Sequence, residues 1–526
     1  MFLYVFGLLW GTVQRELTGT LLWIAIVAAI VRFAQTWRDT LDLPPGPIGL
    51  PVIGLLPKAK GNYHDFFTSL AKKYGSLYST RLGSQLIIVL SDYKLIREAF
   101  RKEVFTGRPI NEFTNILGGY GIINTEGKLW KDQRRFIHDR LRQFGMSYIG
   151  SRKAQMESRI MREVDSFLSF LRSSKNEAID LNHHFQVAIS NVICDIIMSV
   201  RFSHDDSRFK RMMNLIEEGF RLFGSIDLVQ FIPLMKYLPK SRNIRQKISE
   251  NRAEMGIFLQ ETIDDHRKSF DPTKIRDLLD AYLLEIEKAN EEGTGKHLFE
   301  GKDHDRQIQQ IMGDLFSAGM ETIKSTLQWG VLFMLHNPKW MKAVQDELRA
   351  VVGHKRLPTL EDLKYLPLTE ATIYEILRVS SVVPMGTTHS PIRDVNMSGY
   401  KFPRQSQVIP LLRAVHTDPN LWDRPEEFNP MRFITAEGKV TKPEYFMPFG
   451  VGRRTCLGEV LARMELFLFF SSLLHCFDLE VPSGEDLPSL EGFYGVTITP
   501  RPFKICLKER RVEWDDIQPV KTHGFH

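Results

Sequence analysis

The 526-residue chain has little of several features that mark particular classes of protein. It has only four cysteines (Cys194, Cys456, Cys476 and Cys506) and no CxxC pair, so neither a zinc site nor a disulfide framework is expected. We expect reduced thiols, as in a protein that faces the cytosol. Its 69 basic and 63 acidic residues leave a net charge of only +6, which argues against a nucleic-acid-binding face.

What the sequence does contain is the composition of a large folded domain. Hydrophobic residues make up 43% of the chain and charged residues 25%, which excludes a disordered protein. Thirty-five Phe and 18 Met indicate a large, adaptable apolar interior. Helical patterns dominate, and the alternating segment Ser76–Asp92 predicts two paired strands with a turn at residues 82–84. Since nothing marks a second core, we predict one mainly α domain with a small β subdomain.

The N-terminus is the most apolar region, and we predict that residues 1–38 form a membrane anchor. The uncharged residues Leu17–Val31 would span about 22 Å as a helix, short of a hydrocarbon core of about 30 Å. Starting the helix before Arg15, or extending it past a snorkelling Arg32, closes that gap. A cleaved signal peptide is the rival interpretation, and it fits less well because no Lys or Arg precedes Arg15.

The anchor is followed by a segment rich in proline and glycine. This composition indicates a stiff, extended hinge over residues 39–56, which would hold a folded domain at a set orientation to a membrane. We place one large domain at residues 57–509 and a polar C-terminal tail at residues 510–526.

The segment around Cys456 carries the most chemical information. Gly450 and Gly452 permit a tight turn, and a helical pattern begins just after Cys456. A cysteine at a helix N-terminus faces unpaired backbone N–H groups and the positive end of the helix dipole, and both favour the thiolate. With Arg454 two residues before it, Cys456 is a candidate metal ligand. A lone cysteine is more often a small buried apolar side chain, so the neighbouring residues decide between the two interpretations.

Those neighbours match a known signature. Phe449, Gly452, Arg454, Cys456 and Gly458 fit the pattern FxxGxRxCxG, and the segment resembles the haem-binding loop of the cytochrome P450 superfamily. The resemblance implies a P450-type domain in which the thiolate of Cys456 is the axial ligand of the iron of haem b. It also implies that Arg454 pairs with a haem propionate. Phe449 would pack against the thiolate side, and Gly458 would lie at the cofactor.

A second motif concerns the stability of the domain. Glu375 and Arg378 lie three residues apart on one helix face and match the superfamily's ExxR motif. The resemblance implies a buried structural network between this pair and Arg432. Taken alone, such a pair is usually a surface salt bridge of little energetic weight.

Four further residues resemble the superfamily's propionate-binding positions. Trp130 and Arg134 match its WxxxR motif, and the resemblance assigns both to haem propionates. His389 lies where related chains place a propionate-binding His or Arg, and Arg108 is a similar candidate. As lone residues, these side chains would more often be ordinary surface or stacking groups.

A long helical pattern contains Ala318-Gly319-Met320-Glu321-Thr322, which matches the superfamily motif [AG]Gx[DE]T. The resemblance implies that Ala318 and Gly319 lie at the haem and that the glycine lets the helix open there. It also implies that Glu321 and Thr322 relay protons during oxygen chemistry. The alternative is that Thr322 merely donates a hydrogen bond to a carbonyl one turn earlier.

Longer segments narrow the resemblance. Residues 314–507, most clearly within 314–329 and 442–470, look closely similar to the ecdysteroid 26-hydroxylases of arthropods. This similarity implies hydroxylation of the terminal side-chain carbon of ecdysone and 20-hydroxyecdysone, which inactivates moulting hormone. By family analogy, five segments line the substrate cavity: 110–123, 220–231, 314–318, 382–388 and 493–496. Asp314, Thr387 and Thr388 are candidates for hydrogen bonds to steroid hydroxyls.

Electron supply and location follow from the same resemblance. No flavin- or dinucleotide-binding motif is present, so electrons must come from a partner. The resemblance implies NADPH as the indirect source, through a membrane-bound NADPH–cytochrome reductase, with cytochrome b5 as a second candidate partner. It implies an endoplasmic reticulum membrane location with the catalytic domain facing the cytosol. Basic residues near the haem-binding segments are candidates for a docking face: Lys131, Arg134, Arg135, Lys442 and Arg453.

Three other functions stay open at this point. The first keeps the chemistry and changes the substrate to fatty acids or xenobiotics. The second is a haem-thiolate isomerase or dehydratase that does not use oxygen, although Glu321 and Thr322 argue against it. The third is a haem-binding sensor without turnover.

Overall fold

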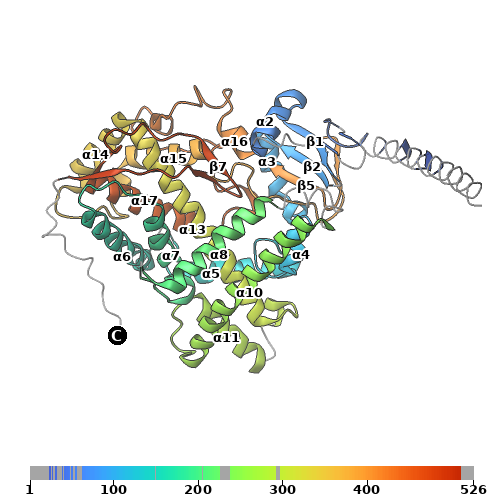
Figure 1. Cartoon of the computed structure of the whole chain (residues 1–526), viewed down its shortest axis with the longest axis horizontal. Helices are drawn as coiled ribbons and strands as arrows, with labels where there is room; N and C mark the ends of the chain where they lie inside the picture. The colour runs from blue at the N-terminus through green and yellow to red at the C-terminus, as the bar shows by residue number, and fades with distance from the viewer. Residues whose placement is uncertain are drawn as a thin grey trace, which may run out of the picture.

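The computed structural model describes residues 62–510, apart from 84, 148, 149, 204, 226–236 and 292–295, together with scattered residues between 20 and 55 (Figure 1). Most of the predicted anchor, part of the hinge and the tail beyond Arg510 therefore lie outside the described residues. Within the part described, no helix combines the length and the apolar character needed to cross a membrane.

Most of the described chain is helical, as the sequence predicts. The α-helices are α2 (Tyr63–Tyr74), α3 (Tyr93–Arg101), α4 (Glu112–Leu117), α5 (Gly127–Gln143), α6 (Ser151–Ser173), α7 (Asn182–Met198), α8 (Ser207–Ser225), α10 (Pro239–Lys268), α11 (Leu278–Glu291), α12 (Lys296–Phe299), α13 (His304–His336), α14 (Pro338–Val352), α15 (Pro367–Ser380), α16 (Leu412–His416) and α17 (Glu459–Cys476). Short 3-10 helices are η1 (Glu103–Thr106), η3 (Leu363–Tyr365), η4 (Pro430–Phe433) and η5 (Gly452–Arg454).

The strands are short and form four small sheets. They are β1 (Leu77–Leu82), β2 (Gln85–Leu90), β3 (Val395–Met397), β4 (Tyr400–Phe402), β5 (Gln407–Pro410), β6 (Phe477–Glu480), β7 (Gly492–Tyr494), β8 (Ile498–Pro500) and β9 (Cys506–Glu509). β1 and β2 pair antiparallel with Leu82 opposite Gln85, which confirms the predicted hairpin. β5 joins them in parallel beside β2, while β3–β4, β6–β9 and β7–β8 are separate antiparallel pairs.

Helix α13 runs through the middle of the helical part of the molecule and contacts α7, α10, α15 and α17 (Figure 1). Every residue from Lys324 to Leu335 is buried, so this half of α13 is surrounded by other elements. Helix α17 is similar, because its residues from Met464 to Cys476 are all buried. Such helices are apolar around their circumference, which explains the richness in Phe and Leu that the sequence shows there.

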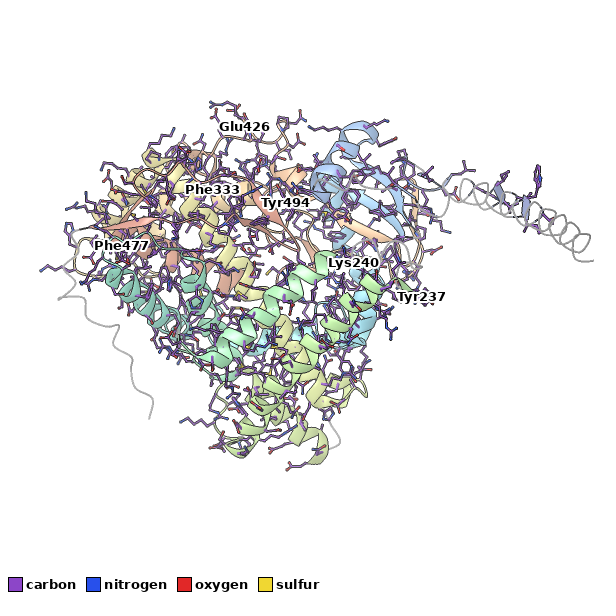
Figure 2. The ribbon with its side chains drawn as sticks, viewed as in Figure 1. Tyr237, Lys240, Phe333, Glu426, Phe477 and Tyr494 are labelled. Atoms are coloured by element: carbon purple, nitrogen blue, oxygen red, sulfur yellow. The ribbon has the colours of Figure 1, made fainter. Side chains whose placement is uncertain are left out.

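The small β part lies at one end of the molecule, where the β1–β2–β5 sheet packs with α2 and α3 (Figure 1). Two apolar clusters hold it, one built on Ile88, Leu90 and Phe100 and the other on Phe67 and Tyr78. Side chains fill the space between the helices in the rest of the molecule, where one large cluster forms the core (Figure 2). The mainly α fold with a small β part is therefore confirmed.

Candidate active site

The loop before α17, residues 449–458 (the cysteine loop), has a shape that only glycine permits at two positions. Gly450 and Gly452 have φ angles of 72° and 81°. A Cβ on Gly452 would also lie 2.1 Å from the backbone oxygen of Phe100, at the end of α3. The amide of Cys456 donates a hydrogen bond to the Phe449 carbonyl at 2.9 Å, which closes the turn. The loop therefore presents Cys456 three residues before α17 begins.

The surroundings of Cys456 differ from the expectation for an activated thiol. Burial raises the pKa of the Cys456 thiol, while the Gly458 amide and Arg134 act in the opposite direction. The net direction is opposite to the sequence-based expectation, because burial outweighs the effect of the helix N-terminus. Yet the side chain has an exposed surface, so Cys456 opens onto space that is itself enclosed by protein. Ala318 is likewise exposed, although Phe316 and Met320 on the same helix are buried.

Three predicted propionate-binding arginines come together near this loop. The Arg454 guanidinium donates to the carbonyls of Thr106 and Thr125, and Arg134 donates to the Thr455 carbonyl at 2.6 Å. Arg108 donates to the carbonyls of Ile123 and Thr388 at 2.8 and 2.7 Å. Burial, with Arg108 and Arg134 nearby, lowers the pKa of Arg454 to about 7, and burial, with Arg134, lowers that of Arg108 to about 10.

Trp130 and His389 complete this cluster. The Arg454 guanidinium lies 3.9 Å from the centre of the Trp130 ring, so Trp130 stacks with Arg454. His389 donates from Nδ1 to the Phe105 carbonyl at 2.8 Å and stacks on Phe100 with ring centres 3.7 Å apart. Burial and the adjacent Arg108 lower the pKa of His389 well below its usual value, so the imidazole is neutral.

These residues fit a flat anionic cofactor. Arg108 and Arg134 lie close enough to Arg454 to lower its pKa, against which the Glu126 carboxylate acts. None of the three guanidinium groups makes an ion pair with a carboxylate in the part of the chain that the structure describes. A buried cationic cluster of this kind is costly unless an anion faces it. A Cβ built on Gly458 would meet no atom within 4 Å, which leaves room beside Cys456. The residues present therefore fit a haem, whose two propionates are the anions that the cluster lacks.

Helix α13 is continuous where the sequence predicts an opening. All residues from Ala318 to Thr322 are α-helical, and the Thr322 hydroxyl donates to the Ala318 carbonyl at 2.8 Å. The expected opening at Gly319 is therefore wrong for this structure, because the hydroxyl satisfies the carbonyl within the helix. The glycine is instead required by close packing, since a Cβ there would lie 2.6 Å from Cδ1 of Ile193 on α7.

Glu321 has a partner that motif matching missed. Its carboxylate makes an ion pair with Lys324 at 2.8 Å and accepts a hydrogen bond from Ser325 at 3.3 Å. Lys324 is only 4% exposed and also lies 4.0 Å from Glu217 on α8. The spacing of three residues on one helix face was a usable signal for this pair.

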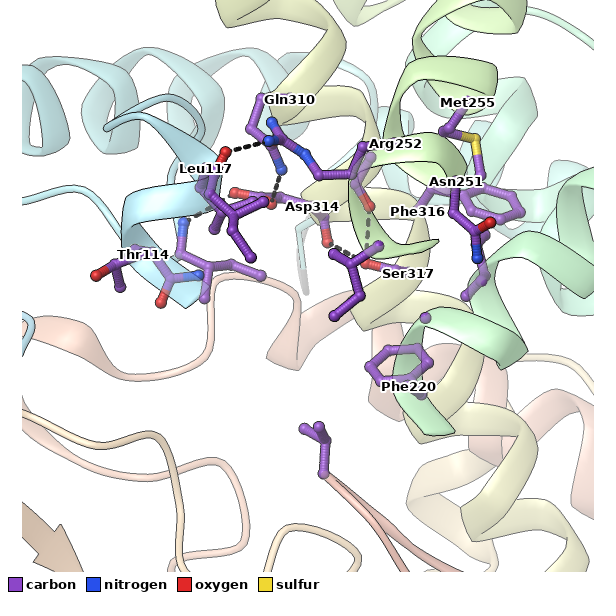
Figure 3. A pocket seen from close by; sticks show the side chains of 18 of the residues that line it. Thr114, Leu117, Phe220, Asn251, Arg252, Met255, Gln310, Asp314, Phe316 and Ser317 are labelled. Atoms are coloured by element: carbon purple, nitrogen blue, oxygen red, sulfur yellow. Dashed lines mark hydrogen bonds between the residues drawn. The ribbon is translucent and has the colours of Figure 1, made fainter. Parts of the chain in front are cut away.

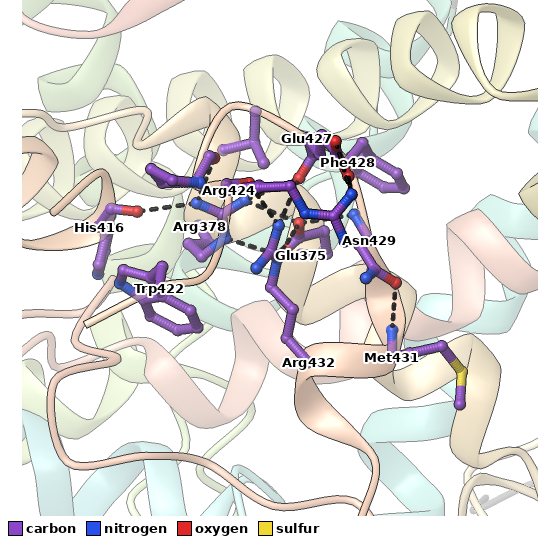
Figure 4. A network of polar contacts seen from close by, with 12 residues as sticks. Glu375, Arg378, His416, Trp422, Arg424, Glu427, Phe428, Asn429, Met431 and Arg432 are labelled. Atoms are coloured by element: carbon purple, nitrogen blue, oxygen red, sulfur yellow. Dashed lines mark hydrogen bonds and ion pairs between the residues drawn. The ribbon is translucent and has the colours of Figure 1, made fainter. Parts of the chain in front are cut away.

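The predicted structural network is confirmed (Figure 4). Arg378 donates to both carboxylate oxygens of Glu375 at 2.7 and 2.8 Å, and Arg432 donates to Glu375 at 3.1 Å. Glu375 and Arg378 are fully buried. Arg378 also donates to the carbonyls of His416 and Pro425, and Asn429 donates its amide to Glu375. With every group hydrogen-bonded, the buried charges hold α15 to the segment that carries η4.

A cavity of about 1540 Å³ lies beside the N-terminal half of α13 (Figure 3). Its wall includes Arg108, Phe316, Ser317, Thr387 and Thr388, and extends to α10 on one side and to α2 and β7–β8 on the other. All five predicted wall segments contribute to the lining, although residues 226–231 lie outside the described part.

Two of the predicted polar contacts are already engaged. Asp314 accepts hydrogen bonds from the amides of Ile122 and Ile123 at 2.8 and 3.0 Å, and from Gln310 at 2.9 Å. This residue therefore ties α13 to the loop at Gly121, where a Cβ would lie 2.4 Å from the Asp314 carboxylate. The Thr387 hydroxyl accepts from Arg108 at 3.3 Å. Asp314 therefore supports the cavity wall, and its role in binding steroid hydroxyls stays a prediction.

Comparisons with known proteins agree with this geometry. The family model described as Cytochrome P450 matches residues 44–507. The chain is 59% identical over 500 residues to cytochrome P450 18a1 of Drosophila melanogaster, an alignment that covers 95% of this chain and 93% of that protein. It is 34% identical over 493 residues to cytochrome P450 2U1 of Rattus norvegicus, covering 89% of this chain and 91% of the relative. It is also 34% identical over 478 residues to cytochrome P450 2D6 of Homo sapiens, covering 89% and 93%.

The fold, the cysteine loop and these matches place the chain in the cytochrome P450 family. It is accordingly a P450 monooxygenase, an oxidoreductase. The family holds haem through a cysteine thiolate and takes its electrons from NADPH through a reductase.

Proposed function

We propose that this P450 hydroxylates the terminal side-chain carbon of ecdysone and 20-hydroxyecdysone. The observation that carries the proposal is the close similarity of residues 314–507 to arthropod ecdysteroid 26-hydroxylases. The 59% identity to a Drosophila melanogaster P450 along 95% of the chain supports an arthropod-type substrate. The cavity, at about 1540 Å³, is larger than the roughly 300–1000 Å³ of ordinary ligand pockets, so a bulky steroid has room in it.

In this proposal, the thiolate of Cys456 would bind the iron of haem b, with Phe449 and Gly458 beside the cofactor. Arg108, Arg134, Arg454 and His389 would face the propionates, and Trp130 would fix the guanidinium of Arg454 by stacking. The haem, when bound, supplies the activation of dioxygen and the oxidation of the C–H bond. The protein's share is to hold the substrate, exclude water and deliver protons.

Proton delivery falls to Glu321 and Thr322. Glu321 is held in one position by Lys324 and Ser325, so its carboxylate is available to pass a proton without losing its place. The Thr322 hydroxyl donates to Ala318 and can also accept a proton on its oxygen while releasing its own. A relay from Glu321 through Thr322 would therefore bring protons to the exposed surface at Ala318, beside the proposed haem position.

We further propose that the chain is anchored to the endoplasmic reticulum membrane and takes electrons from NADPH–cytochrome reductase, with cytochrome b5 as a second partner. Several residues of the proposed basic face are already engaged. Lys131 makes an ion pair with Glu103, and Arg134 donates into the cysteine loop. Arg453 donates to the Arg101 carbonyl and keeps an exposed surface. Arg135, Lys442 and Arg453 are therefore the better candidates for contacting an acidic partner.

The decisive experiment is spectral titration of the haem-loaded enzyme with ecdysone and, in parallel, with dodecanoic acid, followed by product identification with the reductase. We expect ecdysone to displace the water ligand, shift the spin state and yield a 26-hydroxylated product. Oxidation of dodecanoic acid with no response to ecdysone would instead support the fatty-acid alternative.

A further inference from the structure

His64 is a buried polar side chain that the fold leaves unsatisfied. It lies in the first turn of α2 and is 2% exposed, and neither ring nitrogen has a hydrogen-bond partner among the residues that the structure describes. Its ring packs edge-on against Tyr494 of β7, with centres 4.8 Å apart (Figure 2 labels Tyr494). Because buried polar groups are nearly always hydrogen-bonded, this exception needs an explanation.

The same residue lines the large cavity. His64, Asn62 and Tyr494 form part of its wall at the end bounded by α2 and β7–β8, and Ser317, directly before Ala318, belongs to the wall along α13. A substrate with its oxidised carbon near Ala318 would therefore extend its far end toward His64 or toward α10. Of these two ends, the one at His64 carries the unsatisfied group.

The charged groups around His64 determine which of its ring nitrogens can accept a hydrogen bond. Burial lowers the pKa of His64 to about 4, with Arg413 acting in the same direction and Asp65 against it, so the imidazole is neutral near pH 7. Asp65 Oδ1 lies 3.3 Å from Nδ1, outside hydrogen-bonding geometry but close enough to favour the proton on that nitrogen. A neutral imidazole protonated on Nδ1 leaves Nε2 as an acceptor.

We propose that the His64 ring, whose Nε2 is covered by protein in this structure, turns toward the cavity so that Nε2 accepts a hydrogen bond from a hydroxyl group at the end of the substrate farthest from the oxidised carbon. An alcohol can donate this hydrogen bond. A carboxylate can only accept hydrogen bonds, so its oxygen would face the lone pair of Nε2 without a proton between them. His64 therefore selects hydroxylated steroids over fatty acids. For ecdysone, oxidised at its side chain, the donors at the far end are the two hydroxyls of the A ring. This inference rests on the proposed function for the identity of the steroid.

The test compares ecdysone with a derivative that lacks both A-ring hydroxyls, by spin-state titration of the haem-loaded enzyme. We expect the wild type to bind ecdysone about 5- to 10-fold more tightly, the value of one hydrogen bond. His64→Phe keeps the aromatic contact with Tyr494 and should abolish this preference. His64→Gln offers a carbonyl acceptor and should restore part of it, a recovery that a merely structural role would not produce.

His475→Phe is the matched control. His475 is also buried, has an unsatisfied Nε2 and has its pKa lowered by burial to about 4, but it lies in α17 and does not line the cavity. Its replacement should leave the preference intact. Equal binding of the two steroids by the wild type, or an unchanged preference in His64→Phe, would overturn the role of His64. Hydroxyl-dependent binding without a 26-hydroxylated product would support the role of His64 and refute the proposed reaction.

Discussion

Cys456 differs from the other cysteines in where its side chain lies. Cys194 and Cys476 are buried within helices, and Cys506 is partly buried in a strand, whereas Cys456 sits in a loop with an exposed surface. Sulfur donation to iron requires such an accessible position, so the four thiols should behave very differently toward haem.

We predict that Cys456→Ser removes the long-wavelength Soret band of the reduced carbon-monoxide complex, because a serine oxygen cannot replace the thiolate. The band should persist in Cys506→Ser, which changes a thiol of a β-strand instead. A Cys456→Ser protein that kept an unshifted band would show that the ligand lies elsewhere.

Lys324 gives a second prediction at the residue scale. In Lys324→Met, the Glu321 carboxylate would stay buried with only the Ser325 hydroxyl as partner, so its position and protonation would change. We expect the yield of product per NADPH to fall about 10-fold while the haem spectrum stays normal, since a relay of this kind contributes roughly 100-fold or more. Lys324→Arg should preserve most of the yield.

The control for this change is Lys342→Met on α14, whose side chain is 74% exposed in its pair with Asp346. It should leave coupling as it is in the wild type. If Lys324→Met were as well coupled as Lys342→Met across the pH range, proton delivery would not depend on the Glu321–Lys324 pair.

The spacing of residues in the sequence predicted some of these contacts and not others. Glu375 and Arg378, three apart on one helix, were predictable as a pair, and Arg432 followed from the family resemblance. The stacking of Arg454 on Trp130 could not be read from the sequence, because it depends on how two distant segments dock. Nothing in the sequence marked His64, whose unsatisfied state exists only once α2 packs against β7.

At the scale of elements, the cysteine loop depends on its contact with α3. Gly452 combines a φ of 81° with a position where an added Cβ would collide with the Phe100 backbone, and the two effects can be separated. Gly353, after α14, has the same φ of 81° but open space around it.

We predict that Gly353→Ala lowers stability by about 1–3 kcal/mol, the cost of holding an alanine at φ 81° and ψ −146°, and leaves haem content unchanged. Gly452→Ala should cost more and reduce haem content, because the added methyl must push the loop away from α3. Thermal unfolding and haem-to-protein ratios measure both effects. Equal behaviour of the two variants would mean that the close approach has no influence on the loop.

Local sequence patterns predicted single helices and hairpins better than the contacts between distant elements. The β1–β2 hairpin followed from alternation within one segment, whereas the parallel pairing of β5 with β2 joins residues far apart in sequence. The expected opening of α13 at Gly319 was wrong because a motif cannot show that Thr322 closes its hydrogen bond inside the helix.

At the scale of the whole molecule, the sequence predicted a single mainly α domain. The stability of this domain should depend on pH, because a buried pair of ionisable side chains joins α10 to the start of α11. Nε2 of His266 lies 3.0 Å from Asp277, and Nδ1 donates to the Thr262 carbonyl. Burial disfavours the charged imidazole, but the hydrogen bond and charge of Asp277 outweigh it, so the pKa of His266 is raised.

A raised pKa means that this stabilisation is fully present below pH 6.5 and is lost as the pH rises through the folded-state value. We predict that His266→Gln lowers the thermal midpoint by about 1–2 °C at pH 6 and by less at pH 8.5. His138→Gln, which alters an exposed pair with Asp139, should show no such trend. A deficit in His266→Gln that stayed constant with pH would exclude a charged histidine.

The contact between α3 and the cysteine loop also constrains the order of events during biosynthesis. The bond from Arg453 to Arg101 joins residues 352 positions apart, and Gly452 takes its place against Phe100 in the same contact. The ribosome must therefore translate most of the protein before the cysteine loop can dock on α3. Haem capture must then be a late, essentially post-translational step, because a chain truncated before residue 449 lacks Cys456, the proposed iron ligand.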